Sequence, residues 1–156
     1  MKKIKDFMKK WKEQAGLTLV ELLAVIVILG IIAGIAVPSI GGIIENSKKD
    51  AHISNAIMLA NAAKLANIDR STAGSDSIYT ITELNTGGYL EGTPPSPGNA
   101  GEYDPANSKV EIAESSGVVT YTITLQDTTA TPHIYINGEL LSALQADGAR
   151  ALVVLE

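Results

Sequence analysis

The chain has 156 residues and contains no cysteine. No disulfide can staple it, so its domain must be held together by packing. Histidine is also scarce, because the sequence has only His52 and His133, which lie on different predicted elements and have no thiol companion. Without a cluster of ligand-type residues at metal spacing, we predict no metal site and no cofactor.

The sequence also lacks the short motifs that accompany catalysis. It contains no G-x-S-x-G elbow, no phosphate-binding P-loop, no dinucleotide-binding glycine pattern and no H-E-x-x-H zinc motif. Serine, histidine and acidic residues are scattered, and no spacing among them indicates a catalytic triad. We therefore predict that the protein is not an enzyme.

Positive charge is scarce beyond the N-terminus. The net charge of the chain is −5, yet residues 1–16 hold six lysines against Asp6 and Glu13, a net charge of +4. The other 140 residues therefore carry −9. Nucleic-acid binding needs lysine and arginine clustered against phosphate, so this acidic part of the chain disfavours a nucleic-acid partner.

What the sequence has in abundance is one long apolar run. Residues 22–44 contain no charge, and a helix of that length spans roughly 35 Å, against about 30 Å for a bilayer core. Its apolar side chains occur all round the helix rather than along one stripe, which favours lipid. Because lysines beside a membrane segment stay cytoplasmic, we predict one span of the cytoplasmic membrane, with the N-terminus inside and the C-terminal part outside.

Two residues at the start of this run distinguish it from an ordinary anchor. Glu21 lies one turn inside the apolar stretch, and a carboxylate costs on the order of 3 kcal/mol at the bilayer centre and less near its edge. Gly16 directly follows the basic segment, so that residues 16–21 read GLTLVE. The n-region of an ordinary secretory signal is the alternative, but such a signal has a shorter apolar run and a small-residue cleavage site.

This combination resembles the processing motif of type IV prepilins and of the related pseudopilins. Their signal has a short basic leader, a glycine before the cut, a hydrophobic first mature residue and a glutamate four residues further on. Here those residues are Gly16, Leu17 and Glu21, although phenylalanine or methionine is more usual than leucine at the first mature position. The resemblance implies that a prepilin peptidase cleaves after Gly16 and methylates the new amino group of Leu17.

The resemblance also implies a role for Glu21 in assembly. A new α-amino group on Leu17, with an ordinary pKa near 8, opposes the helix dipole, whereas a carboxylate in the first turns complements it. Glu21 is four residues from Leu17 and so faces the same side of the helix. In the family, pairing of this glutamate with the amine of a neighbouring copy is thought to set axial register, and we expect the same salt bridge here. The alternative is a glutamate that snorkels to the headgroups.

A soft segment is predicted in the middle of the helix. Pro38 removes one helix hydrogen bond and clashes with the preceding turn. The nearby glycines, which weaken the helix further by up to about 1 kcal/mol each, are Gly30, Gly41 and Gly42. In filaments of the resembling family such a segment loses helicity, so we expect an extensible fibre. Gly30 also forms G-x-x-x-G with Gly34, which permits close helix contact. The alternative is a helix that ends near Pro38 and restarts at about Ile43.

The rest of the sequence predicts an α+β fold, in which the long helix packs on a small antiparallel sheet of three to four strands. Apolar residues recur every three or four positions as far as Asp69, which indicates an amphipathic second half of the same helix. His52 lies on this half, and we interpret it as a surface histidine. The predicted divisions are a leader (1–16), a membrane and fibre-core helix (17–44), its amphipathic half (45–69), a connector (70–107) and a sheet region (108–156).

The connector is predicted to be a loop, a short helix and a proline-rich stretch. Thr82–Thr86 fits the helix, with Gly87 or Gly88 as its cap. The stretch that follows has four prolines and cannot form a sheet interior. Glu102 and Asp104 within it allow a calcium site as an alternative to a plain loop.

Alternating apolar and polar residues predict the strands. The predicted strands are Lys109–Ala113, Val118–Leu125, His133–Asn137 and Ala149–Leu155. Residues 139–145 fit a helix or a strand equally well. Asp127–Thr131 is rich in threonine, and we expect an exposed loop that could carry a glycan.

These observations favour a structural subunit. The leading hypothesis is a type IV pilin that forms a helical surface fibre of many copies, used for adhesion, motility or DNA uptake. The alternative is a pseudopilin or minor pilin of a type II-like secretion or competence machine, which shares every motif above. A third is a single-pass anchor for an outward binding domain. For the first two, the resemblance implies that the partners are membrane lipid before assembly, the prepilin peptidase, other pilins and a membrane assembly platform.

Overall fold

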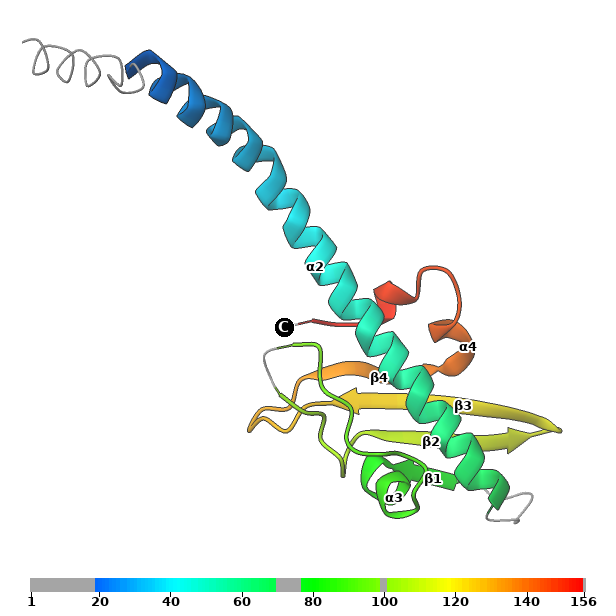
Figure 1. Ribbon diagram of the computed structural model, residues 1–156. Coiled ribbons are helices and arrows are strands. Elements are labelled where there is room, and N and C mark those ends of the chain that lie inside the picture. Colours follow the sequence, from blue (N-terminus) through cyan, green and yellow to red (C-terminus); the bar gives the residue numbers. More distant parts are fainter. Residues whose placement is uncertain (1–18, 70–76, 99–100, 156) are drawn as a thin grey trace, which may run out of the picture. The chain divides into compact units, whose positions relative to one another are not determined.

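The computed structural model describes residues 19–69, 77–98 and 101–155 (Figure 1). The chain divides into two compact units between Gly42 and Ile43, and we describe each by itself. The elements in chain order are α2 (Leu19–Asp69), β1 (Ser77–Thr80), α3 (Ile81–Thr86), β2 (Lys109–Ser115), β3 (Val118–Gln126), β4 (Ile134–Leu140), α4 (Leu141–Leu144) and the 3₁₀ helix η1 (Ala149–Leu152).

The described part of the first unit is the N-terminal portion of α2. Its residues from Leu19 to Ile35 are all exposed, because no other described segment covers them. The helix continues through Pro38 without interruption. The alternative, a helix that ends near Pro38 and restarts at about Ile43, is therefore wrong. A continuous helix still lacks the hydrogen bond that Pro38 cannot donate.

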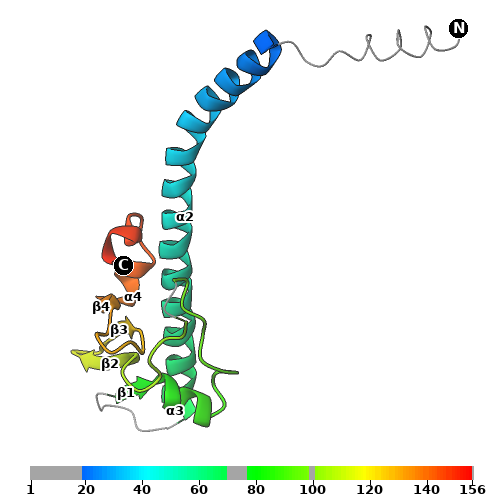
Figure 2. The same cartoon turned by 90° about the vertical axis from the view of Figure 1, so that its left-hand side faces the viewer.

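The second unit is built on the remainder of α2, which lies along one face of a sheet (Figure 2). Its buried face follows the predicted three- and four-residue spacing and is made chiefly of alanines. The apolar residues of that face with no exposed surface are Ala56, Leu59, Ala60 and Ala63. Small side chains let a helix approach a sheet closely, so alanine at these positions sets the tight contact.

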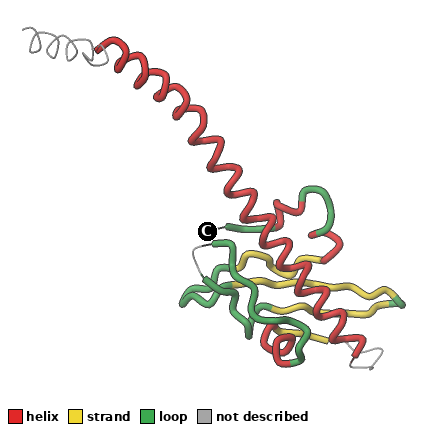
Figure 3. Tube along the Cα trace, in the orientation of Figure 1, coloured by secondary structure: helices red, strands yellow, loops and turns green. Residues whose placement is uncertain are grey.

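Four antiparallel strands form the sheet in the order β1-β2-β3-β4, as predicted for an α+β fold (Figure 3). Val110 pairs with Ile123, and Leu125 pairs with Ile136. Because directly paired residues point to the same face, these four side chains form one buried layer beneath α2. The strands predicted from alternation at 109–113, 118–125 and 133–137 correspond to β2, β3 and β4.

The predicted fourth strand, Ala149–Leu155, is wrong. Gly148 has φ of 89°, a left-handed conformation that starts a tight turn, and η1 follows it. After η1 the chain joins the sheet through a backbone bond from Val154 N–H to the Tyr135 carbonyl, at 3.0 Å. The fourth strand is instead β1, which lies in the segment that we predicted as connector. It was missed because it is only four residues long and is followed at once by α3.

The short helix α3 follows β1 directly and has a complete N-terminal cap. The Thr80 hydroxyl accepts from the Glu83 backbone N–H at 3.2 Å, and a Glu83 carboxylate oxygen accepts from the Thr80 N–H at 2.9 Å. This reciprocal pair is a capping box. The helix ends at Thr86, as predicted, and Gly87 rather than Gly88 is its C-terminal cap. In the stretch 139–145, which fits helix or strand, β4 continues to Leu140 and α4 begins at Leu141.

Two polar residues in the core differ from the sequence-based expectation. His52 has no exposed surface, so its interpretation as a surface histidine is wrong. It lies four residues before Ala56, on the same buried face of α2, which is a spacing signal that the sequence does contain. Asp127 is also fully buried, whereas Thr128–Thr131 are exposed as expected.

Candidate functional site

The candidate site is the N-terminal part of α2. Gly16 and Leu17, the predicted cleavage residues, lie outside the described residues. The described helix starts at Leu19 and places Glu21 in its first turn. A carboxylate there complements the positive end of the helix dipole, so its position suits both the helix and an amine nearby.

An unusually large apolar surface surrounds this part of α2. Side chains such as Leu19, Ile26 and Ile35 are between 61% and 82% exposed. The helix is long and apolar enough to cross a membrane, and none of its most apolar stretch is buried. Water does not tolerate a continuous apolar surface of this extent, so it must contact lipid or other apolar helices.

The glycines of the predicted soft segment have no packing role among the described residues. A methyl group added at Gly30, Gly34, Gly41 or Gly42 would meet nothing within 4 Å. Glycine is therefore not required there by any contact within the chain that the structure describes. What these glycines offer is a low-profile surface for a neighbouring helix and a weaker helix around Pro38.

A bidentate ion pair fastens the C-terminal region to α2. Arg150 donates from Nε to Asp50 Oδ1 and from Nη2 to Asp50 Oδ2, both at 2.6 Å. The hydrogen bonds from Arg150 lower the pKa of Asp50 and, in turn, the carboxylate raises the pKa of Arg150. The two residues are 100 positions apart, so no local sequence signal could reveal the pair.

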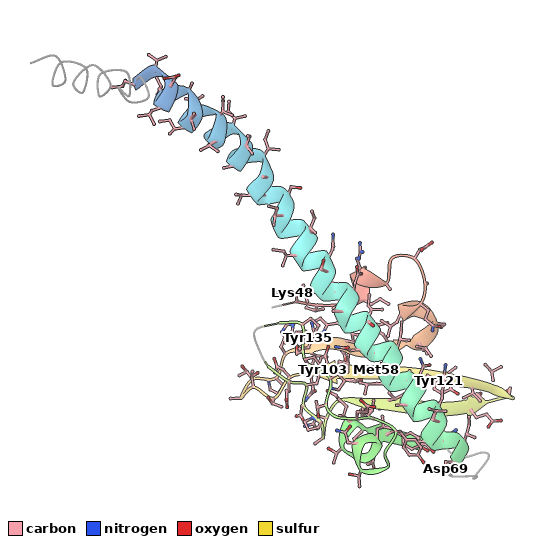
Figure 4. All side chains as sticks on the ribbon, viewed as in Figure 1. Lys48, Met58, Asp69, Tyr103, Tyr121 and Tyr135 are labelled. Atoms are coloured by element: carbon pink, nitrogen blue, oxygen red, sulfur yellow. The ribbon has the colours of Figure 1, made fainter. Side chains whose placement is uncertain are left out.

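The proline-rich connector is fastened to α2 at a second point. The Asn55 side-chain amide donates to the Pro95 carbonyl at 3.0 Å and to the Tyr103 hydroxyl at 3.3 Å. Tyr103 is fully buried and lies close to Tyr135 (Figure 4). Further along the helix, the Lys64 ammonium lies 4.9 Å from the centre of the Tyr121 ring. The second unit thus holds α2 through specific polar contacts as well as through its core.

The described residues contain no group of three or more histidine or acidic side chains placed to hold a metal ion. Asp104, considered for calcium, accepts instead from the Asn107 side-chain amide at 2.6 Å and from the Ala106 and Asn107 backbone N–H groups. These hydrogen bonds, that from the Asn107 side chain first, lower the pKa of Asp104. Its carboxylate therefore organises a turn of the connector.

Both the N-terminal motif and the longer chain are similar to known proteins. Residues 11–37 match the family described as the prokaryotic N-terminal methylation motif. The chain is 32% identical to the type II secretion system core protein G of Vibrio cholerae over 108 residues, which is 62% of this chain and 74% of that protein. It is 33% identical to the protein of the same name from Dickeya chrysanthemi over 90 residues, 56% of this chain and 55% of that protein.

The protein of the same name from Escherichia coli is 29% identical over 102 residues, 58% of this chain and 70% of that protein. No solved structure matches the chain. The matched N-terminal motif, the exposed apolar helix and the α+β second unit agree with one another. On this evidence the chain belongs to the type IV pilin-like family that includes the type II secretion system core protein G.

Proposed function

We propose that this protein is the main structural subunit of a type II-like secretion pseudopilus, a short fibre of many copies. The observation that carries the proposal is the 32% identity to a secretion-system core protein over 74% of that protein's length. The alternative of a type IV surface pilus shares the N-terminal motif, but none of the three relatives described above is a pilus protein by name.

The first step proposed is removal of the leader. A prepilin peptidase cleaves between Gly16 and Leu17 and methylates the new amino group. The leader carries a net charge of +4, which holds it on the cytoplasmic side until it is cut. Cleavage replaces this charged segment with one small cation at the tip of an apolar helix, which lowers the cost of moving that tip out of the headgroup region.

The second step is recognition between copies. Glu21 of one subunit accepts a hydrogen bond from the methylated amine of Leu17 on the neighbouring subunit. The two charges meet in a low-dielectric surrounding, where an ion pair is much stronger than in water. Burying one charge without the other is expensive, so docking is favourable only in the register that brings both together. The pair therefore acts chiefly to set the axial position of each subunit.

The third step is transfer of the apolar helix from lipid to the fibre core. The exposed side chains of residues 19–35 contact lipid before assembly and the helices of other copies afterwards. Gly30 and Gly34 allow close approach of a neighbouring helix because they carry no side chain, and a Cβ at either position would meet no described residue within 4 Å. The second unit faces outwards, and other pilins and the membrane assembly platform are the expected partners.

A secretion assay separates this proposal from the pilus alternative. Cells lacking the gene should retain in the cell proteins that the wild type exports, and the wild-type gene should restore export. Electron microscopy of sheared surface material should find no long fibres at normal expression. Export that proceeds unchanged without the gene, together with long fibres lost in the same strain, would replace the pseudopilus by a surface pilus.

Processing is tested by the variant Gly16→Ala. Mass spectrometry should find the wild-type chain beginning at a methylated Leu17, and the variant still beginning at Met1. The matched control Ala15→Ser should be processed like the wild type. A simple membrane anchor would accumulate and function identically in all three forms.

A further inference from the structure

Both histidines of the chain contact the same aromatic ring. The His52 ring, from α2, stacks on Tyr135 of β4 with 4.2 Å between centroids and 23° between planes. His133, just before β4, contacts the same Tyr135 ring edge-on, with 4.9 Å between centroids. Tyr103 of the connector completes the cluster, T-shaped to His52 at 5.7 Å. Two other segments, the connector and β4, therefore contact one buried histidine of α2, through the Tyr103 and Tyr135 labelled in Figure 4.

The hydrogen bonding of His52 favours its neutral form. Nδ1 lies 2.7 Å from the Tyr103 hydroxyl, which also accepts from the Asn55 amide at 3.3 Å. Nε2 is buried and has no hydrogen-bond partner among the described residues. Whichever nitrogen carries the proton of the neutral ring, the second proton of an imidazolium would add a donor to a site that already leaves one nitrogen unsatisfied.

The charged groups around His52 oppose a positive ring as well. Burial first, and then the nearby His133 and Lys48, lower the pKa of His52 to about 4. From the connector comes Tyr103, whose pKa burial raises, so that it stays a neutral phenol. The carboxylates of Asp50 and Asp127 are already engaged: Asp50 binds Arg150, and Asp127 accepts from Thr129 and the His133 backbone.

We propose that His52 is an acid-sensitive latch: protonation of its ring breaks its contacts with Tyr103 and Tyr135 and thereby loosens residues 43–55 of α2, while the following turns remain on the sheet. The following turns carry the alanine face, Ala56 to Ala66, whose own buried side chains are alanines and Leu59 and so take up no proton. The Arg150–Asp50 ion pair is a second tie on the same stretch, and because the pKa of Asp50 is lowered, this tie survives to a lower pH than the histidine contact. Release should therefore be stepwise, with the ring leaving first. The inference concerns the second unit alone and does not depend on the proposed secretion role.

The size of the effect follows from linkage between protonation and release. A ring with a pKa of about 4 in the latched state and about 6.5 when released shifts the equilibrium towards release as pH falls. The ratio of released to latched molecules rises about tenfold for each pH unit between those two values. Above pH 6.5 this equilibrium no longer depends on the protonation of His52, and the latch loosens progressively as the pH falls from 6.5 towards 4.

The test is hydrogen exchange of the full-length protein in detergent micelles between pH 7 and pH 4, corrected for the intrinsic pH dependence of exchange. Protection of residues 43–55 should fall at least tenfold, while residues 56–66 keep theirs. His52→Phe, which can stack on Tyr135 but cannot take up a proton, should abolish the pH dependence. The control His133→Phe should retain it.

Unchanged protection of residues 43–55 in the wild type down to pH 4, or the same loss in His52→Phe, would overturn the proposal. If His52→Phe fails to fold, the titration of the His52 ring by NMR in the wild-type protein decides the matter. A pKa well below 6.5, with chemical-shift changes across residues 43–55 that follow the same titration, supports the latch. An ordinary pKa near 6.5 rules it out.

Discussion

Asp50 and Arg150, 100 residues apart, form a two-bond ion pair in which both nitrogen–oxygen distances are 2.6 Å. About half of each side chain is exposed, so water and salt weaken the pair. Its effect is therefore positional: it ties η1 to α2 at the point where α2 leaves its apolar portion.

The first prediction concerns this pair. Arg150→Ala and Asp50→Ala should each lower the melting temperature slightly, and the double variant should lose less than the sum of the two. Because the pKa of Asp50 is lowered, the contribution is present above its ordinary pKa of 3.8 and is lost as pH falls through the lowered value. A double-mutant cycle by thermal unfolding, repeated at high salt, checks this, and a coupling that salt does not reduce would contradict it.

The second prediction concerns Asp127. Its carboxylate accepts from the Thr129 N–H at 3.1 Å, the Thr129 hydroxyl at 2.7 Å and the His133 N–H at 3.1 Å. Asp127→Ala leaves these donors without an acceptor next to a buried site, so we expect a loss of about 1–3 kcal/mol in the free energy of unfolding. Denaturant unfolding measures it, with the exposed Thr128→Ala as control.

The same residue gives a stability profile with pH. Burial by itself raises the pKa of Asp127, but hydrogen bonds from Thr129, His133 and Tyr135 outweigh burial and lower it. A lowered pKa in the folded state means that the carboxylate stabilises the fold above pH 3.8 and that this stability disappears as pH falls through the lowered value. The variant Asp127→Asn should flatten that part of the profile, and an unchanged profile would show that the carboxylate is not responsible.

The third prediction tests the assignment of faces on α2. Leu59 has no exposed surface, whereas its neighbour Met58 is 42% exposed. Leu59→Ala should cost about 2–5 kcal/mol because it opens a cavity between α2 and the sheet. Met58→Ala should change the free energy of unfolding by no more than about 0.5 kcal/mol. Equal losses in the two variants would mean that the helix is rotated about its axis.

Leu59 and Met58 also show which part of the fold can be predicted from the sequence. The spacing of alanine and leucine along residues 56–66 predicts the buried face, and alternation predicts β2, β3 and β4. The same spacing includes His52, yet a lone histidine on a helix reads as a surface residue because histidine is seldom fully buried. Local patterns also fail where contacts are distant: Tyr103, Tyr135 and His52 come from three segments, and only the assembled fold brings them together.

At the two ends of the sheet, alternation of apolar and polar residues failed to predict the strands correctly. Residues 149–155 alternate well enough to predict a strand, but the left-handed Gly148 turns the chain into η1, and Val154 afterwards makes a backbone hydrogen bond to Tyr135 without forming a strand. Residues 77–80 form a strand that alternation over four positions cannot reveal. At the N-terminus the situation is reversed, because Gly16, Leu17 and Glu21 stand out in the sequence through their spacing. The function proposed for them involves a peptidase and other copies of the chain.

The fourth prediction concerns Gly34. A side chain there would meet no described atom of the chain within 4 Å, so Gly34→Leu should leave the melting temperature of the second unit unchanged. Assembly should fall sharply, because a bulky residue keeps a neighbouring helix at a distance. Cross-linking of cells followed by immunoblotting measures the higher oligomers. The control Leu29→Ile should assemble normally, since it keeps both size and polarity.

The last prediction concerns Glu21, and it tests the pairing that is proposed to set subunit register. Glu21→Ala should be inserted and cleaved normally, because it makes the apolar helix easier to place in lipid. It should nevertheless fail to form oligomers, since no acid would meet the amine of Leu17. The matched control is Glu45→Ala, which removes an exposed carboxylate whose partner is Lys49 at 3.3 Å and should assemble. N-terminal mass spectrometry establishes that cleavage has occurred, and cross-linking measures assembly. Oligomers of Glu21→Ala at the wild-type level would show that register is set by helix packing alone, whereas failure of both variants would point to a general need for acidic residues on α2.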